Sequence, residues 1–230
     1  HNADPRYARV PVGTLLDEGH LAGIVDQVRE PSVAAAPASQ GDTVALVAAD
    51  ETGLAVTLIQ SLYDGFGSGI LEPSTGVVLH SRGSAFSLDP SHPNVLAGGK
   101  RPAHTLLPVV VHREGRLAAV TGTMGGGGHP QIDAMSLFRA FDLGMDAGSA
   151  VSAPRWLVGG MALGRSDRTL LAEGSVPVRT RRALTAAGYA VETIDALDER
   201  VGHAHLIRVR DDGAFEAGSD PRADGDVGVR

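Results

Sequence analysis

The clearest pattern of hydrophobic positions lies near the middle of the first half of the chain. Two apolar runs, TVALVAAD (Thr43–Asp50) and LAVTLIQSL (Leu54–Leu62), are separated only by ETG. Short runs of this kind, bounded by turn residues, are typical of paired strands. We therefore predict a β-hairpin here, and further strands over residues 75–80, 106–114, 116–122, 204–210 and 214–218.

Helical spacing of apolar residues appears in three other stretches: Asp17–Glu30, Ile132–Asp146 and Val178–Tyr189. The first places Leu21, Ile24, Val25 and Val28 on one face, and the second does so for Met135, Phe138 and either Leu137 or Phe141. Gly188 is a plausible end for the third helix. Strands followed by helices predict a layered α/β sandwich with mostly antiparallel strands.

Composition and charge narrow the class of protein. The 230 residues are 43% hydrophobic and 20% charged, with a net charge of −7, and they include no cysteine. This composition is that of a globular domain, and the acidic balance argues against non-specific binding to nucleic acid. No window is long and apolar enough to span a membrane, so we expect no membrane partner. The missing cysteines exclude disulfides, thiolate zinc sites and cysteine nucleophiles.

The segment before the hairpin differs from it in amino-acid composition. PSVAAAPASQGD, from Pro31 to Asp42, is small, proline-punctuated and almost uncharged, which is typical of a linker or surface loop. The sequence opens with His1 rather than Met. We therefore leave the compartment open, with cytoplasmic and secreted locations both possible.

Four consecutive glycines occur in TGTMGGGGHPQ, from Thr121 to Gln131. A phosphate-binding loop needs Lys and Ser or Thr after its last glycine, and a dinucleotide fingerprint needs spaced glycines, so neither motif fits. A row of unhindered N–H groups at a strand end, before a helix, suits an anionic oxygen. From this stretch alone, a glycine loop without a ligand is about as good an interpretation.

Five motifs in order resemble the gamma-glutamyltranspeptidase family, and specifically its small catalytic subunit. They are FGSGI, GKRPAHTLLP, TMGGGGHPQ, DLGMD with AVSAPRW, and GSDPRADG. The resemblance covers nearly all of residues 43–230, and it implies that residues 1–42 correspond to the end of the large subunit and a cleavable linker. It also implies an α+β fold, the four-layer αββα sandwich of N-terminal-nucleophile hydrolases.

The resemblance implies roles for individual residues. The precursor would cut itself between Asp42 and Thr43, and Thr43, the first residue of the first strand, would become the nucleophile. A free N-terminal threonine carries its own base, an α-amine with a pKa near ~8, beside its hydroxyl. Gly125 and Gly126 would supply the oxyanion hole. Ser61 would support the nucleophile, although a plain turn serine is an equally good interpretation.

The sequence departs from the family at the positions that hold the amino-acid end of glutamate. These positions read Tyr63, Arg82, Ala85, His104 and Thr105, where the family has an Asn, a Gln or Glu with an Asp, and two serines. Ala85 replaces the acid that pairs with the substrate's α-ammonium. Arg82 could instead hold a carboxylate, with Tyr63, His104 and Thr105 as pocket walls. The alternative for Arg82 is a loop arginine that faces solvent.

We therefore expect an enzyme of the family's divergent branch, which includes oxamate amidohydrolases and cephalosporin or glutaryl acylases. Its substrate would be a small amide whose acyl part carries a carboxylate, its partner the large subunit of the same precursor, and no cofactor is implied. Two alternatives stay open: a gamma-glutamyl hydrolase or transferase, and an unprocessed relative without catalysis that binds a partner. The histidines are scattered without a ligand pattern, so no metal site is predicted. SDPRADG near the C-terminus is assigned no catalytic role.

Overall fold

The computed structural model describes residues 3–29, 41–159 and 169–229. Two long strands, β1 (Gly41–Ala49) and β2 (Ala55–Asp64), form the antiparallel hairpin expected from the apolar runs. The connection turns at Gly53, whose φ of 86° is one that glycine adopts at little cost. Asp50 accepts hydrogen bonds from the backbone of Thr52 and Leu54 and so fixes the turn.

A four-stranded antiparallel sheet forms the centre of the molecule, in the order β11-β10-β6-β5. The predicted strands are confirmed here, with bounds shifted by a few residues: β5 (Val109–Arg113), β6 (Arg116–Met124), β10 (His203–Val209) and β11 (Phe215–Ser219). The β5–β6 turn places Glu114 and Gly115 at positive φ, as a tight two-residue hairpin turn requires.

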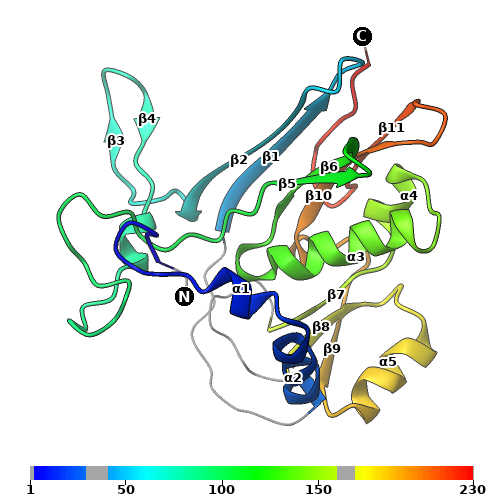
Figure 1. Cartoon of the computed structure of the whole chain (residues 1–230), viewed down its shortest axis with the longest axis horizontal. Coiled ribbons are helices and arrows are strands. Elements are labelled where there is room, and N and C mark those ends of the chain that lie inside the picture. Colours follow the sequence, from blue (N-terminus) through cyan, green and yellow to red (C-terminus); the bar gives the residue numbers. More distant parts are fainter. Residues whose placement is uncertain (1–2, 30–40, 160–168, 230) are drawn as a thin grey trace.

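The hairpin covers one face of this sheet, and helices α3 (His129–Phe141) and α4 (Ala147–Ser152) cover the other (Figure 1). The strands approach closely at Gly122, where a Cβ would meet Thr57 and Ala45 of the hairpin. The main hydrophobic core lies between the sheet and the two helices. Its fully buried members include Ala119, Ile132, Val151, Leu157 and Leu206.

A smaller unit packs beside this core. Strands β7 (Trp156–Val158), β8 (Thr169–Glu173) and β9 (Ala190–Ile194) form a three-stranded sheet in which β8 and β9 run parallel. Helix α5 (Val178–Ala186) connects the two parallel strands (Figure 1). The sequence analysis predicted the helix but missed these three short strands.

The remaining elements connect or flank these layers. They are α1 (Val12–Leu15), α2 (Glu18–Arg29), strands β3 (Leu71–Glu72) and β4 (Val77–Val78), and three 3₁₀ turns, η1 (Arg82–Ala85), η2 (Gly126–Gly128) and η3 (Glu199–Val201). The strand predicted over 75–80 is reduced to β4. Most of the predicted linker, residues 30–40, lies outside the described residues.

Two sequence predictions need correction. Strand β1 begins at Gly41, so Thr43 is not the first residue of its strand but follows two paired residues. Helix α3 begins at His129 and ends at Phe141, and its apolar face was wrongly assigned because Phe138 is 54% exposed. The buried face instead includes four polar side chains: His129, Asp133, Ser136 and Arg139.

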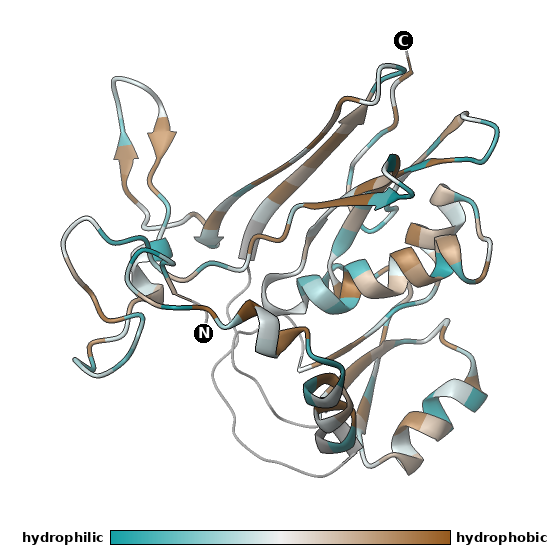
Figure 2. Ribbon diagram, in the orientation of Figure 1, coloured by the Kyte–Doolittle hydropathy of each residue, from teal (hydrophilic) through white to brown (hydrophobic). Residues whose placement is uncertain are grey.

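The outer face of the hairpin is apolar but uncovered by the described part of the chain. Exposed and half-buried residues alternate along β1 and β2, and both strands are largely apolar in sequence (Figure 2). The outward residues Val44, Leu46, Val56 and Leu58 are each 45–58% exposed. The described residues thus show helix, sheet and hairpin layers, with no helix on that outer face. No described helix has the length and apolar character needed to cross a membrane.

Candidate active site

Thr43 and Ser61 lie opposite one another in the hairpin. The register pairs them directly, and the Thr43 hydroxyl donates a hydrogen bond to Ser61 Oγ at 2.8 Å. Ser61 Oγ also accepts the backbone N–H of Tyr63 at 3.0 Å. Because both side chains point toward the central sheet, the predicted nucleophile and its predicted support share one site.

The backbone is irregular at the predicted cleavage position. Asp42 pairs with Tyr63 while Thr43 pairs with Ser61, so the register shifts between Asp42 and Thr43 and leaves Leu62 as an extra residue. Tyr63 has a φ of 79°, which a bulky residue rarely adopts. Bulges of this kind occur next to active sites, where they redirect a side chain or interrupt pairing.

The glycine loop follows β6 directly and leads into α3. Gly126 has a φ of 54°, and a Cβ on Gly125 would collide with the side chain of Ile132, so neither position accepts an ordinary residue easily. The loop is tightened by a hydrogen bond from Gly128 N to Gly125 O at 2.8 Å. Gly125 and Gly128 lie where a Cβ would collide with the side chains of Ile132 and Leu157, so the backbone of this loop packs closely against its neighbours.

A cavity of about 400 Å³ lies beside the predicted nucleophile. Thr43 lines it together with Met124, the residue immediately before the glycines. His203 lines the same cavity from β10, and it pairs with Met124 in the sheet register. The other walls come from Val44, Glu199 and the C-terminal residues Pro221, Arg222, Ala223 and Asp224.

Arg82, Tyr63 and Thr105 come together near this site. The Arg82 guanidinium stacks on the Tyr63 ring at 4.0 Å from the centroid, and it donates to Thr105 Oγ1 at 3.5 Å. Arg82 is only 8% exposed, so it is not the solvent-facing loop arginine of the alternative interpretation. Burial lowers its pKa, and the neighbouring Tyr63 and Asp64 partly offset this.

No carboxylate within the described ranges lies at ion-pair distance from Arg82. The nearby acid, Asp64, accepts the Ser81 hydroxyl at 2.8 Å instead. His104 is exposed beside Thr105. The structure therefore brings three of the four predicted substrate-binding residues together and leaves a buried cation with unused hydrogen-bonding capacity.

A buried polar cluster, not anticipated from the sequence, lies behind the glycine loop. His129, Asp133 and Ser136 of α3 face Thr121 and Thr123 of β6, and all five residues are nine-tenths buried or more. Thr121 donates to Asp133 at 3.4 Å, and Thr123 Oγ1 is hydrogen-bonded to His129 Nδ1 at 2.9 Å. Burial is the main cause of raising the pKa of Asp133 to about 7.

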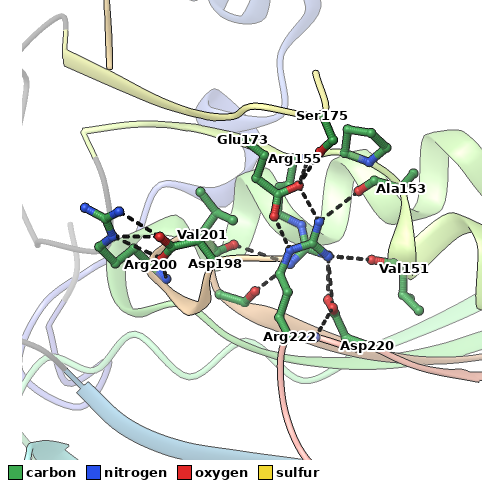
Figure 3. A network of polar contacts seen from close by, with 12 residues as sticks. Val151, Ala153, Arg155, Glu173, Ser175, Asp198, Arg200, Val201, Asp220 and Arg222 are labelled. Atoms are coloured by element: carbon green, nitrogen blue, oxygen red, sulfur yellow. Dashed lines mark hydrogen bonds and ion pairs between the residues drawn. The ribbon is translucent and has the colours of Figure 1, made fainter. Parts of the chain in front are cut away.

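A second missed feature is a buried ion network that holds the C-terminal segment (Figure 3). Arg155 donates to Asp220 at 2.7 Å, and Arg222 donates to Glu173 at 2.7 Å and to Asp220 at 2.9 Å. All four side chains are fully buried. Because Pro221–Asp224 line the Thr43 cavity, SDPRADG forms a wall of the candidate site.

The ion network has no signal in local sequence, because Glu173 and Arg222 lie 49 residues apart in the chain. The motif GSDPRADG was the one hint available in the sequence, and it does not indicate which residues its charged side chains pair with. Within the described ranges, no three His, Cys, Asp or Glu side chains gather as a metal-binding group.

The fold is that of the N-terminal-nucleophile hydrolases with solved structures. It matches a cephalosporin acylase from Bacillus halodurans with a TM-score of 0.82 and 29% identity, over 98% of this chain and 41% of that one. It matches a gamma-glutamyltranspeptidase from Pseudomonas nitroreducens with a TM-score of 0.67 and 28% identity, over 81% of this chain and 98% of that one.

Sequence comparison narrows this class to one family. The family model described as gamma-glutamyltranspeptidase matches residues 1–229. Two relatives are an oxamate amidohydrolase proenzyme from Klebsiella pneumoniae, 38% identical over 98% of this chain, and a glutathione hydrolase-like YwrD proenzyme from Bacillus subtilis, 37% identical over 96%. The chain belongs to the gamma-glutamyltranspeptidase family. It spans 43% and 42% of the length of these two relatives.

Proposed function

We propose that this chain carries the catalytic part of a self-processing amide hydrolase. The single observation that carries the proposal is the hydrogen bond between Thr43 Oγ1 and Ser61 Oγ, beside a cavity that Met124, the residue before the glycines, also lines. Thr43 would be released as a new N-terminus by cleavage after Asp42. Residues 43–230 would then form the catalytic region, and residues 1–42 the end of the preceding region with its linker.

The chemistry uses groups of this chain alone. Thr43 Oγ1 attacks the amide carbonyl carbon, and its proton passes to the free α-amine of Thr43, whose ordinary pKa near ~8 suits a base at neutral pH. The N–H groups of Gly125 and Gly126 stabilise the negative oxygen. The tetrahedral intermediate expels the leaving amine, which takes the proton, and water then hydrolyses the threonine ester to the free acid.

Cleavage is essential to this proposal. In the continuous chain the nitrogen of Thr43 belongs to a peptide bond inside β1, and an amide nitrogen is no base. The shifted register between Asp42 and Thr43 supports cleavage at this bond, because it interrupts regular pairing there. The names of both relatives describe proenzymes, which agrees with a processed protein.

For the substrate, we propose an amide whose acyl part carries a carboxylate, as in oxamate, glutaryl or cephalosporin-type compounds. Arg82 would bind that carboxylate, since it is buried, stacked on Tyr63 and without an acidic partner in the described residues. A carboxylate that accepts two parallel N–H bonds is the usual partner of such a guanidinium. One relative is named for oxamate, an amide that carries a carboxylate, which supports this choice.

The partner we propose is the remaining region of the same precursor. The outward residues Val44, Leu46, Val56 and Leu58 form an apolar sheet face, and a monomeric fold rarely leaves such a face in water. The chain spans less than half the length of its relatives, so further chain of the same precursor would cover this face and complete the fourth layer.

The first alternative, a gamma-glutamyl hydrolase or transferase, has one observation in its favour, the relative named glutathione hydrolase-like at 37% identity. Against it stands Ala85 where the family has an acid for the α-ammonium. The second alternative, an unprocessed binding protein, is motivated by the 42 residues that precede Thr43 in this chain.

The decisive test begins with intact mass and N-terminal sequencing of protein expressed from its complete gene. A chain that begins TVALVAAD supports the proposal, and an uncut Asp42–Thr43 bond contradicts it. The cleaved protein is then given oxamate, a glutaryl amide and glutathione. We expect Arg82→Met to raise KM for the carboxylate amides by at least about tenfold, the size of a lost charged hydrogen bond. Arg200→Met, at an exposed arginine, is the matched control.

A further inference from the structure

The two residues that flank the glycine loop are bonded to each other. Thr123 stands just before Met124 and the four glycines, and His129 follows them directly. Thr123 Oγ1 and His129 Nδ1 are hydrogen-bonded at 2.9 Å, and both residues are buried, with exposures of 0% and 1%. This side-chain contact closes the loop at its base, where β6 ends and α3 begins.

A loop of this composition needs such a restraint. Glycine has more backbone freedom than any other residue, so four in a row cost the most conformational entropy when held in one geometry. Oxyanion stabilisation depends on N–H groups that are already oriented before the charge develops. A loop that samples several geometries would present its donors correctly only part of the time.

The base of the loop is further anchored on the α3 side. Gln131 exchanges two hydrogen bonds with the backbone of Val158, each at 3.0 Å. Gly128 fits against Leu157, where a Cβ would lie 2.8 Å from a side-chain carbon. These contacts fix the start of α3, while the bond from His129 to Thr123 is the side-chain link from that start back to β6.

His129 stays neutral in this position. Burial lowers its pKa to about 4, and the charges of Arg82 and His203 contribute in the same direction. A positive imidazolium at the first turn of α3 would also oppose the helix dipole. The His129 ring therefore stays neutral and hydrogen-bonded to Thr123 across the pH range in which the α-amine of Thr43 acts as a base.

We infer that Thr123 and His129 are positioning residues that clamp the glycine loop and hold the Gly125 and Gly126 N–H groups in place. This inference rests on the proposed function, in which those groups bind the oxyanion. Neither Thr123 nor His129 lines the cavity beside Thr43. Its loss should therefore lower kcat and leave KM nearly unchanged, since it acts on an interaction made in the transition state.

The test uses protein expressed from its complete gene, with paired variants. Thr123→Val removes the hydroxyl at constant shape, and Thr123→Ser keeps it. His129→Leu removes the ring nitrogen, and His129→Asn keeps a polar atom near the Nδ1 position. We expect kcat to fall about 10- to 100-fold in the first member of each pair and less than about threefold in the second. These losses lie below the ~10²–10³ of a missing oxyanion donor.

Hydrogen–deuterium exchange supplies a readout that needs no substrate. Peptides spanning residues 124–129 should exchange at least about tenfold faster in Thr123→Val and Thr123→Val/His129→Leu, with Thr123→Ser near wild type. The double variant should be no more than about twofold worse than either single variant in kcat, since one bond is lost in each case.

Two results would overturn the clamp: unchanged exchange in Thr123→Val, or a loss of kcat that only follows the unfolded fraction seen by circular dichroism. Failure of the proposed function gives a different pattern. In that case Thr43→Ala turns over amides as well as wild type, or wild type turns over none, whereas the exchange experiment still reports on the loop.

Discussion

The hydroxyl of Thr43 donates to Ser61 Oγ across the β1–β2 hairpin at 2.8 Å. One residue earlier, the register shifts, so Asp42 faces Tyr63 and not Leu62. A regular ladder would carry the pairing of Thr43 smoothly through Asp42. The irregularity instead interrupts the pairing at the Asp42–Thr43 peptide bond, and the hydrogen bond to Ser61 holds the side chain of Thr43 in place. The hairpin thus holds the hydroxyl of Thr43 independently of the chain that precedes it.

The first prediction concerns Thr43 itself. Thr43→Ala removes the hydroxyl, and we expect neither cleavage after Asp42 nor amide turnover, because both steps need that oxygen. Thr43→Ser keeps the hydroxyl and should retain both activities at a reduced rate. Intact mass shows cleavage, and product release shows turnover. Normal cleavage of Thr43→Ala would assign the nucleophile to another residue.

The second prediction concerns Ser61. Ser61→Ala removes the acceptor of the Thr43 hydroxyl and of the Tyr63 N–H. A hydrogen bond of this kind is worth about 1–3 kcal/mol, which corresponds to a rate loss of about 5- to 150-fold. The loss should appear in kcat of the cleaved protein. Ser68→Ala, which removes an exposed serine hydroxyl elsewhere in the chain, is the control. Equal activity of Ser61→Ala and wild type would show that Ser61 is a plain turn serine.

The parts of the fold that could be predicted are those in which local pattern and packing agree. The hairpin was found because its apolar runs are bounded by turn residues. The buried face of α3 was not predicted correctly, because it carries Asp133, Ser136 and Arg139 while Phe138 is exposed. Hydrophobic spacing cannot predict the buried face of a helix when polar groups on that face are stabilised by hydrogen bonds to other elements.

The candidate site divides in the same way. Thr43, Ser61 and the glycines were located because each lies at the end of a predicted strand or within a recognised motif. The burial of Arg82 depends on stacking against Tyr63, whose positive φ no sequence pattern indicated. The wall formed by Pro221–Asp224 depends on ion pairs between residues far apart in the chain. Such pairings are set by tertiary structure alone.

The third prediction concerns the buried network of Figure 3. Glu173→Ala removes one carboxylate partner of the buried Arg222. Breaking a buried ion pair in this way lowers the free energy of unfolding by about 3–5 kcal/mol. Asp198→Ala breaks the pair with Arg200, a half-exposed arginine, and should cost less than about 1 kcal/mol. Urea unfolding compares the two variants. Similar costs would show that the network contributes little beyond a surface ion pair.

The fourth prediction is a dependence of stability on pH that arises from Asp133. Its pKa is raised to about 7 from an ordinary value of 3.8, so the folded protein binds more protons than the unfolded chain between these two pH values. The contribution of Asp133 to the free energy of unfolding is therefore fully present below pH 3.8 and is lost as the pH rises to about 7.

Asp133→Asn removes this ionisation, and its side-chain oxygen can still accept from Thr121. At pH 8 we expect the variant to be more stable than wild type by on the order of 4 kcal/mol, and the difference should shrink to about 1 kcal/mol at pH 4.5. Urea unfolding of both proteins at the two pH values measures this directly. A difference that stays constant between them would mean that Asp133 is ionised in the folded protein at both, and that water or another group pairs with its buried carboxylate.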